Sequence, residues 1–204
     1  MKTFETGFFD LKNFVKSSKT FSFKEKNDQR TVCHVCYNVN DPFMLIMAAS
    51  AISVIDNNKD MAVHFHIFTD GCSKDNEERV KQLAEKFHCV CSLYELDMKP
   101  FEDFHIKVAR FSRITYGRIY MPKVLKGLTD RFIYVDADAM CVGSLKKLWN
   151  LDLKGFCIGA VAEAPDAIKY RADYLKLKSG KYFNDGIMLV DVNEWEKQHI
   201  TEKS

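Results

Sequence analysis

The sequence predicts an α/β fold with a mostly parallel, Rossmann-like sheet and helices on both of its faces. Apolar segments of strand length alternate along the chain with segments of helix length. The connections between them are short, which suits right-handed crossovers between parallel strands. Two acidic residues, Asp136 and Asp138, directly follow one apolar strand, where open α/β sheets bind their ligands.

The N-terminal part differs from the rest of the chain. Residues 1–30 are rich in Phe, Lys and Ser and have no clean period, so we expect an arm that is packed on the domain or partly mobile, and we assign it no regular structure. No repeat or linker divides the remainder. We therefore expect a single domain at residues 31–204.

The first half of that domain alternates strands with helices. The expected elements are strands at 31–37, 62–71 and 90–96 and helices at 42–55 and 74–88. Asp41 is the expected N-cap of the first helix and Pro42 its first residue. This helix is apolar nearly all round, but its fourteen residues are fewer than the roughly 18–20 that a membrane span needs. We expect it to be buried against the sheet.

The second half continues the alternation after an aperiodic loop at 98–109. The expected elements are helices at 112–126, 145–149, 167–177 and 194–203 and strands at 132–135, 156–162 and 186–192. Pro122 should break the first of these helices. Gly143 and Ser144 should turn the chain into the second, and Asn193 should cap the last.

Composition excludes some classes of partner and compartment. The net charge of +2 gives no support for nucleic-acid binding. No apolar signal region opens the chain, and the cysteine count of 7 is odd, so we expect reduced thiols in a cytosolic protein.

The expected strands contain cysteines and histidines, which are the residue types that bind zinc. Cys33 and Cys36 form C-x-x-C, and Cys89 and Cys91 form C-x-C, but strand geometry favours buried small apolar side chains. His34 is expected to be a hydrogen-bonded core residue. His64 and His66 share a strand face like a metal-binding pair, but the nearby sequence offers no third ligand. We therefore interpret both as structural residues.

The two aspartates suggest a different metal. Asp136 and Asp138 lie two residues apart, so both carboxylates should project to one side of the chain. Their repulsion would be removed by a hard divalent cation, Mn²⁺ or Mg²⁺, which keeps free positions for a substrate diphosphate.

Two longer blocks carry a resemblance to a known family. YVDADAMCVGSLKKLWNLDL, which contains the aspartates, and YFNDGIMLVDVNEWEK, from Tyr182 to Lys197, resemble segments of glycosyltransferase family eight. That family comprises retaining sugar-nucleotide transferases, including glycogenin and bacterial lipopolysaccharide glucosyl- and galactosyltransferases. The resemblance runs from about Val32 to the last residue. It implies a GT-A fold and transfer of a hexose, glucose or galactose, from a UDP-sugar to a glycan or lipopolysaccharide-core acceptor.

The resemblance also assigns roles to individual residues. It makes Asp136 and Asp138 the metal ligands and places Arg118 at the diphosphate. The other residues that it implies are Ala137 at the donor, Glu163, Asn184 and Asp185 at the sugar and acceptor, and Tyr37, Asn38 and Asn40 at the base. The family most often has a small residue at position 185, and Pro42 replaces an asparagine that contacts the nucleotide.

Two alternatives accompany this interpretation. In the family, a D-Q-D-type segment and a late histidine follow the last helix seen here, so we expect the 204-residue form to bind a UDP-sugar but transfer it poorly. A catalytically impaired sugar-nucleotide-binding protein is one alternative. The other, a phosphatase of the haloacid dehalogenase type, is disfavoured by Met140 and by the late position of the D-x-D motif. A glycolipid acceptor would imply peripheral contact with the inner face of the membrane.

Overall fold

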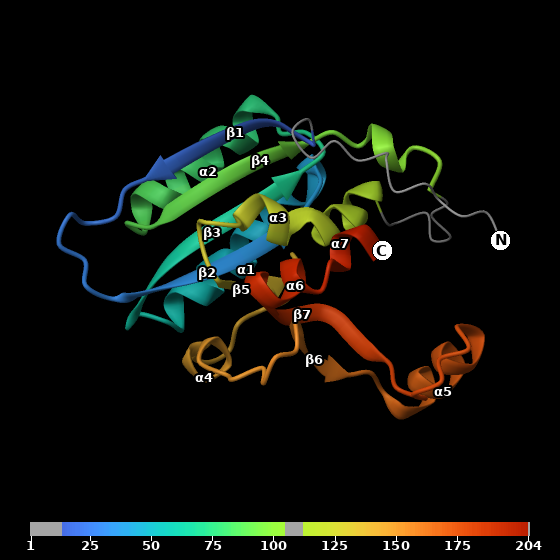
Figure 1. Ribbon diagram of the computed structural model, residues 1–204. Helices are drawn as coiled ribbons and strands as arrows, with labels where there is room; N and C mark the ends of the chain where they lie inside the picture. Colours follow the sequence, from blue (N-terminus) through green and yellow to red (C-terminus); the bar gives the residue numbers. More distant parts are fainter. Residues whose placement is uncertain (1–13, 105–111, 204) are drawn as a thin grey trace.

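A seven-stranded mixed sheet forms the centre of the computed structural model, which describes residues 14–104 and 112–203 (Figure 1). The strand order is β1-β4-β3-β2-β5-β7-β6. The strands are β1 (Val15–Ser22), β2 (Thr31–Asn38), β3 (Met61–Thr69), β4 (Val90–Leu96), β5 (Arg131–Val135), β6 (Ile158–Ala162) and β7 (Phe183–Asp191).

The middle of the sheet is parallel and its two flanks are antiparallel. Strands β4, β3, β2 and β5 run in one direction. At one edge β1 pairs antiparallel with β4, and on the other side β7 pairs antiparallel with both β5 and β6. The α/β class and the parallel centre are confirmed. Strand length and apolar pattern carry no information on direction, so the reversed flanks could not be read from the sequence.

Helices cover both faces of the sheet. Helices α1 (Met44–Asp56) and α2 (Lys74–Lys86) pack on one face, where Val35, Phe65 and Ile133 enter a common core. The other face is covered by the 3₁₀ helix η4 (Arg113–Tyr120), α3 (Met121–Leu125), α6 (Val192–Lys197) and α7 (Ile200–Lys203). Alternating residues of each strand supply the two cores, as buried strands require.

The other described helices are short or peripheral. They are the 3₁₀ helices η2 (Asp41–Phe43) and η3 (Lys99–Phe101) and the helices α4 (Lys146–Trp149) and α5 (Pro165–Tyr174). Two of them supply core residues, Phe101 from η3 and Trp149 from α4. Helix α5 projects away from the sheet beyond β6 and β7 (Figure 1).

Part of the expected arm is a strand. Residues 15–22 form β1 and pair with β4 along its length, so the expectation of no regular structure is wrong there. Most of the β1 side chains are exposed, and the strand is held by backbone hydrogen bonds to an edge far away in sequence. That long-range pairing leaves no local period to detect. The predicted boundary between an arm and a domain at residues 30 and 31 remains a prediction.

Two expected helix starts differ in detail. Asn40, and not Asp41, precedes the short η2 that leads into α1. The Asp41 carboxylate instead accepts hydrogen bonds from Ser73 N and Asn76 Nδ2, both at 2.8 Å, at the start of α2. The segment expected to be one helix at 112–126 begins as η4 and becomes α-helical only at Met121.

The expected burial of the cysteine pairs is confirmed. Cys33, Cys36, Cys89 and Cys91 are all buried and none is in a disulfide. Burial raises the pKa of the Cys33 thiol to about 12, which keeps this thiol protonated. Within residues 14–104 and 112–203, no helix combines the length and apolar character needed to cross a membrane.

Candidate functional site

The turn after β5 carries the two predicted metal ligands. The backbone N–H of Asp136 donates to the Gly186 carbonyl at 2.8 Å, and the Ala139 N–H donates to the Asp136 carbonyl at 3.0 Å. The Tyr134 hydroxyl donates to Asp136 Oδ1 at 2.8 Å and so fixes the carboxylate. Asp138 is exposed, and none of the described residues hydrogen-bonds its side chain. One acid is therefore rigidly held and the other is open to a ligand.

A cavity of about 480 Å³ opens beside this turn. Its walls come from the end of β2, the start of η2, the η4 helix and the β5 turn. The lining residues are Asn38, Val39, Asn40, Phe43, Ser112, Ile114, Thr115, Arg118, Tyr134, Asp136, Ala137 and Asp138. The cavity lies at the carboxyl ends of parallel strands, where ligand sites of open α/β sheets occur.

Arg118 connects this turn with the β7 block. Its NH2 group lies 3.6 Å from Asp136 Oδ1, and its NH1 group lies 2.8 Å from Asp185 Oδ2. The guanidinium also lies over the Tyr134 ring, with Cζ 4.6 Å from the ring centroid, and Nε donates to the Thr115 carbonyl at 3.1 Å. With only 17% of its side chain exposed, Arg118 is a fixed positive charge at the cavity wall.

The residues around Asp136 fit a divalent cation. Burial raises the pKa of the Asp136 carboxyl, and the charges of Asp185 and Asp138 act in the same direction. A bound cation would remove that penalty on the ionised form. A Cβ at Gly186 would lie 2.9 Å from Asp136 Oδ2, so only glycine leaves the space that this carboxylate occupies. Two carboxylates, one exposed and one half-buried, form the oxygen-donor set that Mn²⁺ and Mg²⁺ prefer.

Two asparagines that line the cavity have side-chain acceptors without a partner among the described residues. Asn38 Nδ2 donates to the Ile114 carbonyl, which leaves Asn38 Oδ1 buried without a partner. Asn40 Oδ1 is likewise buried and unpaired among the described residues. Buried acceptors without partners are costly, so these two oxygens suit a ligand that brings N–H or O–H donors.

Glu163 and Asn184 form a separate polar pair at the paired ends of β6 and β7. Asn184 Nδ2 donates to Glu163 Oε2 at 3.3 Å, and Asn184 Oδ1 accepts from the Gly186 N–H at 2.9 Å. Neither residue lines the 480 Å³ cavity. Gly186 is hydrogen-bonded to both Asn184 and Asp136, so the Glu163–Asn184 pair lies next to the acidic turn.

The structure separates one expected residue from the others. Tyr37 is fully buried, its hydroxyl lies 3.0 Å from Ser50 Oγ of α1, and its ring belongs to the α1–α2 core. The interpretation of Tyr37 as a base-pocket residue is therefore wrong for its side chain. Asn38, the next residue, faces the cavity because successive strand residues alternate.

Some residues of the site were not predicted from the sequence. Ser112, the N-cap of η4, and Thr115, within η4, line the cavity, and Gly186 makes room for Asp136. The sequence marked Ser112 and Thr115 only by their closeness to Arg118, and Gly186 only by its place in the N-D-G segment.

Comparison with known proteins decides the family. A model of glycosyl transferase family 8 matches residues 34–204, well over half of the chain. The chain belongs to glycosyl transferase family 8. Every residue discussed above for the cavity and its edge lies within the matched range, so the family assignment includes the whole candidate site.

Bacterial proteins are among those similar to this chain. The chain is 34% identical over 185 residues to a lipopolysaccharide 1,2-glucosyltransferase of Escherichia coli, and this match covers 87% of this chain and 53% of that protein. It is 28% identical over 174 residues to general stress protein A of Bacillus subtilis (strain 168), and this match covers 84% of this chain and 60% of that protein. The chain thus spans about half to three-fifths of the length of these relatives.

Solved structures show the same fold. The crystal structure of the galactosyltransferase LgtC in complex with donor and acceptor sugar analogues matches with a TM-score of 0.72 at 22% identity. The match covers 80% of this chain and 59% of the other. The α/β fold described above is therefore GT-A-like, as expected for family 8.

Proposed function

We propose that this family 8 protein binds a UDP-sugar with Mn²⁺ or Mg²⁺ and transfers its hexose, glucose or galactose, to a glycan or lipopolysaccharide-core acceptor. The observation that carries the proposal is the grouping of Asp136, Asp138 and Arg118 along one wall of a cavity of about 480 Å³. A glucosyltransferase that acts on lipopolysaccharide is among the relatives in the family.

The acidic turn and Arg118 suit the diphosphate. Asp136 and Asp138 would hold the cation, which, when bound, neutralises charge on the leaving diphosphate. Arg118 supplies a second positive charge from the protein itself, and its contacts with Tyr134 and Thr115 hold it in place before the donor arrives. A fixed charge of this kind needs no reorganisation when negative charge develops on the leaving group.

The asparagine end of the cavity suits the nucleoside. Asn40 Oδ1 and Asn38 Oδ1 can accept hydrogen bonds from the uracil N–H or a ribose hydroxyl. Phe43 lies on the same wall, is 42% exposed, and offers an apolar surface for the base. The same cavity is lined by the asparagines and by the acids, which supports a single ligand that carries both a base and a diphosphate.

The Glu163–Asn184 pair is proposed to contact the sugar. It lies next to Asp136 through Gly186, which contacts both Asn184 and Asp136. The amide and carboxylate offer both donors and acceptors, which is what neighbouring sugar hydroxyls need.

A transfer assay tests the proposal. The full chain is incubated with Mn²⁺, radiolabelled UDP-glucose or UDP-galactose, and a lipopolysaccharide-core acceptor, and label in the acceptor is followed together with UDP release. We expect one UDP-sugar to be consumed in preference to the GDP- and ADP-linked sugars. Equal use of all three nucleotide-linked sugars would contradict the proposed donor, and UDP-sugar binding without any consumption would favour the catalytically impaired alternative.

A further inference from the structure

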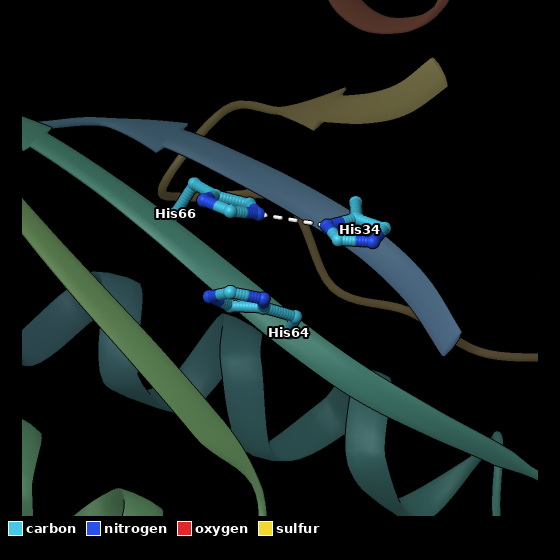
Figure 2. Close-up of side chains that lie close together, drawn as sticks. All are labelled: His34, His64 and His66. Carbon is cyan, nitrogen blue, oxygen red and sulfur yellow. Dashed lines mark hydrogen bonds between the residues drawn. The ribbon is translucent and has the colours of Figure 1, made fainter. Parts of the chain in front are cut away.

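Three histidines meet on the sheet face opposite α1 and α2. His34 is in β2, and His64 and His66 are in β3. The parallel pairing sets His34 directly opposite His64, and His66 follows two residues later on the same face. Figure 2 shows the three imidazoles grouped over the two strands. The third ligand that the nearby sequence lacked is thus supplied by a neighbouring strand.

The ring nitrogens are close together. His34 Nδ1 lies 2.8 Å from His66 Nε2 (Figure 2), and one nitrogen of each of the three rings lies within 4.8 Å of the others. The rings are stacked, with centroids 4.0 Å apart for His64 and His66 and 5.2 Å apart for His34 and His66. Three imidazoles, with no carboxylate in the group, form a nitrogen-only donor set.

In two of the rings, one nitrogen lies within hydrogen-bond distance of a hydroxyl group. His66 Nδ1 lies 3.1 Å from the Tyr94 hydroxyl, and His64 Nε2 lies 2.9 Å from Ser92 Oγ. If each ring donates its N–H to that hydroxyl, then His66 Nε2 and His64 Nδ1 carry lone pairs, and that of His66 Nε2 accepts the hydrogen bond from His34 Nδ1. Partners that fix the tautomer in this way typically accompany metal-ligating histidines.

The cluster suits an ion with an open coordination position. His66 is fully buried, whereas His34 and His64 are half-buried and reachable from solvent. Burial lowers the pKa of all three imidazoles, that of His64 to about 4, so the neutral form with its free lone pair prevails at neutral pH.

We propose that His34, His64 and His66 form a binding site for a divalent transition-metal ion of the Zn²⁺ type, separate from the Asp136–Asp138 site. Imidazole nitrogen suits Zn²⁺ and its neighbours in the series, whereas carboxylate oxygen suits Mn²⁺ and Mg²⁺. Three protein ligands leave the fourth tetrahedral position to water. The two sites are thus expected to select different metals.

Binding requires only small rearrangements. In a tetrahedral zinc site with bonds of about 2.0–2.1 Å, the ligand nitrogens lie about 3.3 Å apart. His34 and His64, the two partly exposed rings, would turn toward His66 to reach this spacing. His34 Nδ1 must act as an acceptor, so its proton moves to Nε2 and the hydrogen bond to His66 is replaced by two bonds to the metal.

Cobalt and zinc titrations of the full chain test the site. Co²⁺ is the optical probe, because four-coordinate Co²⁺ absorbs visible light strongly and thiolate ligands would add a separate charge-transfer band. We expect the strong visible band of four-coordinate Co²⁺ to saturate at one equivalent per chain, without a thiolate band, and to be removed by Zn²⁺, whereas Co²⁺ at the Asp136–Asp138 site adds no strong band. A thiolate band, or no binding, would overturn the proposal.

Variants assign the ligands. His34→Gln and His64→Gln should each weaken Zn²⁺ binding by at least about 10-fold, and Ser92→Ala by about 10-fold. The matched control is His88→Asn, because His88 is exposed and its positive φ of 50° is tolerated by asparagine. Asp136→Asn combined with Asp138→Asn should leave Zn²⁺ binding unchanged. Loss of Zn²⁺ binding in this double variant, or in His88→Asn, would contradict the assignment.

A measurement on the unaltered chain removes any dependence on variant folding. Imidazole ¹⁵N signals are followed by NMR during the Zn²⁺ titration. Signals of His34, His64 and His66 should shift together at one equivalent, while those of His88 and His199 stay in place. Shifts confined to the two exposed histidines would overturn the proposal.

Discussion

Gly186 is the residue at which β7 comes closest to the acidic turn. Its carbonyl accepts the Asp136 N–H, and an added Cβ would lie 2.9 Å from Asp136 Oδ2 and 3.0 Å from Asn184 Oδ1. We expect Gly186→Ala to displace both side chains and to weaken Mn²⁺-dependent UDP binding by about 10-fold, as loss of one positioned group typically does. Calorimetry measures this. Gly143→Ala is the control, because a Cβ there meets nothing within 4 Å.

Asp185 places a negative charge beside the proposed diphosphate site. Its carboxylate is exposed and pairs with Arg118 at 2.8 Å. We expect Asp185→Asn to raise UDP affinity a few-fold at low ionic strength, because Arg118 keeps its bond to the Asp185 carbonyl while the repulsion is removed. The gain should shrink as salt screens the charge. UDP titrations at low and high salt test this, and weaker binding by the variant would show that the carboxylate itself assists the donor.

Residue types at strand ends could be predicted, but their contacts could not. Asp136 and Asp138 stood out because acid directly follows an apolar strand. The prediction for Tyr37 was wrong because the sequence does not show which face of β2 is covered by α1. That choice decides whether residue 37 or residue 38 faces the cavity. The grouping of His34 with His64 and His66 could not be predicted for a related reason, because strand pairing brings His34 beside the other two.

At the scale of elements, Asp41 joins the start of η2 to the start of α2. The Ser73 N–H and the Asn76 side-chain amide lower the pKa of the Asp41 carboxyl. The folded state thus favours the ionised form, and this stability is present above the unfolded pKa of about 3.9 and lost as pH falls through the lower folded value.

Replacement of Asp41 by alanine should therefore be costly at neutral pH and less so in acid. We expect Asp41→Ala to lower the free energy of unfolding by about 1 kcal/mol at pH 7. The difference from the unaltered protein should narrow at pH 3. Urea unfolding at the two pH values measures this, with Asp103→Ala, at an exposed site, as the control. A difference that does not change with pH would contradict the role of the ionised carboxylate.

Strand β1 is anchored to the second core through Phe14. The Phe14 ring is 4% exposed and packs on Tyr120 and Phe101, with centroid distances of 4.5 and 6.1 Å. We expect Phe14→Ala to lower the free energy of unfolding by about 3 kcal/mol through loss of buried area and the cavity left behind. Chemical denaturation measures this. Leu128→Ala, at a side chain that is 57% exposed, should stay within about 0.5 kcal/mol of the unaltered protein.

The existence of most elements followed from period and length, whereas their directions and some boundaries did not. The strands from β2 to β5 and the helices α1 and α2 lie close to where apolar spacing placed them. Strand β7 begins at Phe183, three residues before the expected Gly186, because the exposed residues Phe183 and Asn184 pair with β6. Exposed pairing of this kind has no apolar signature.

At the scale of the whole molecule, the fold brings distant segments to one cavity. The end of β2, the η4 helix and the β5 turn meet there although they are far apart in sequence, and β7 approaches from the side through Gly186. The parallel centre aligns the carboxyl ends of β2 and β5, while the reversed β7 brings its N-terminal residues to the same edge. The mixed topology thus places acid, arginine and amide groups together.

The central claim is that Asp136 and Asp138 bind a divalent cation that completes a UDP site. Calorimetric titration of UDP into the full chain, with and without Mn²⁺, tests it most directly when repeated with Asp138→Asn and with the exposed Asp173→Asn as control. The account predicts that Mn²⁺ tightens UDP binding at least about 10-fold in the unaltered protein and the control. It also predicts that Asp138→Asn abolishes this gain without unfolding the protein. UDP binding of equal strength with and without Mn²⁺, or an undiminished gain in Asp138→Asn, would contradict it.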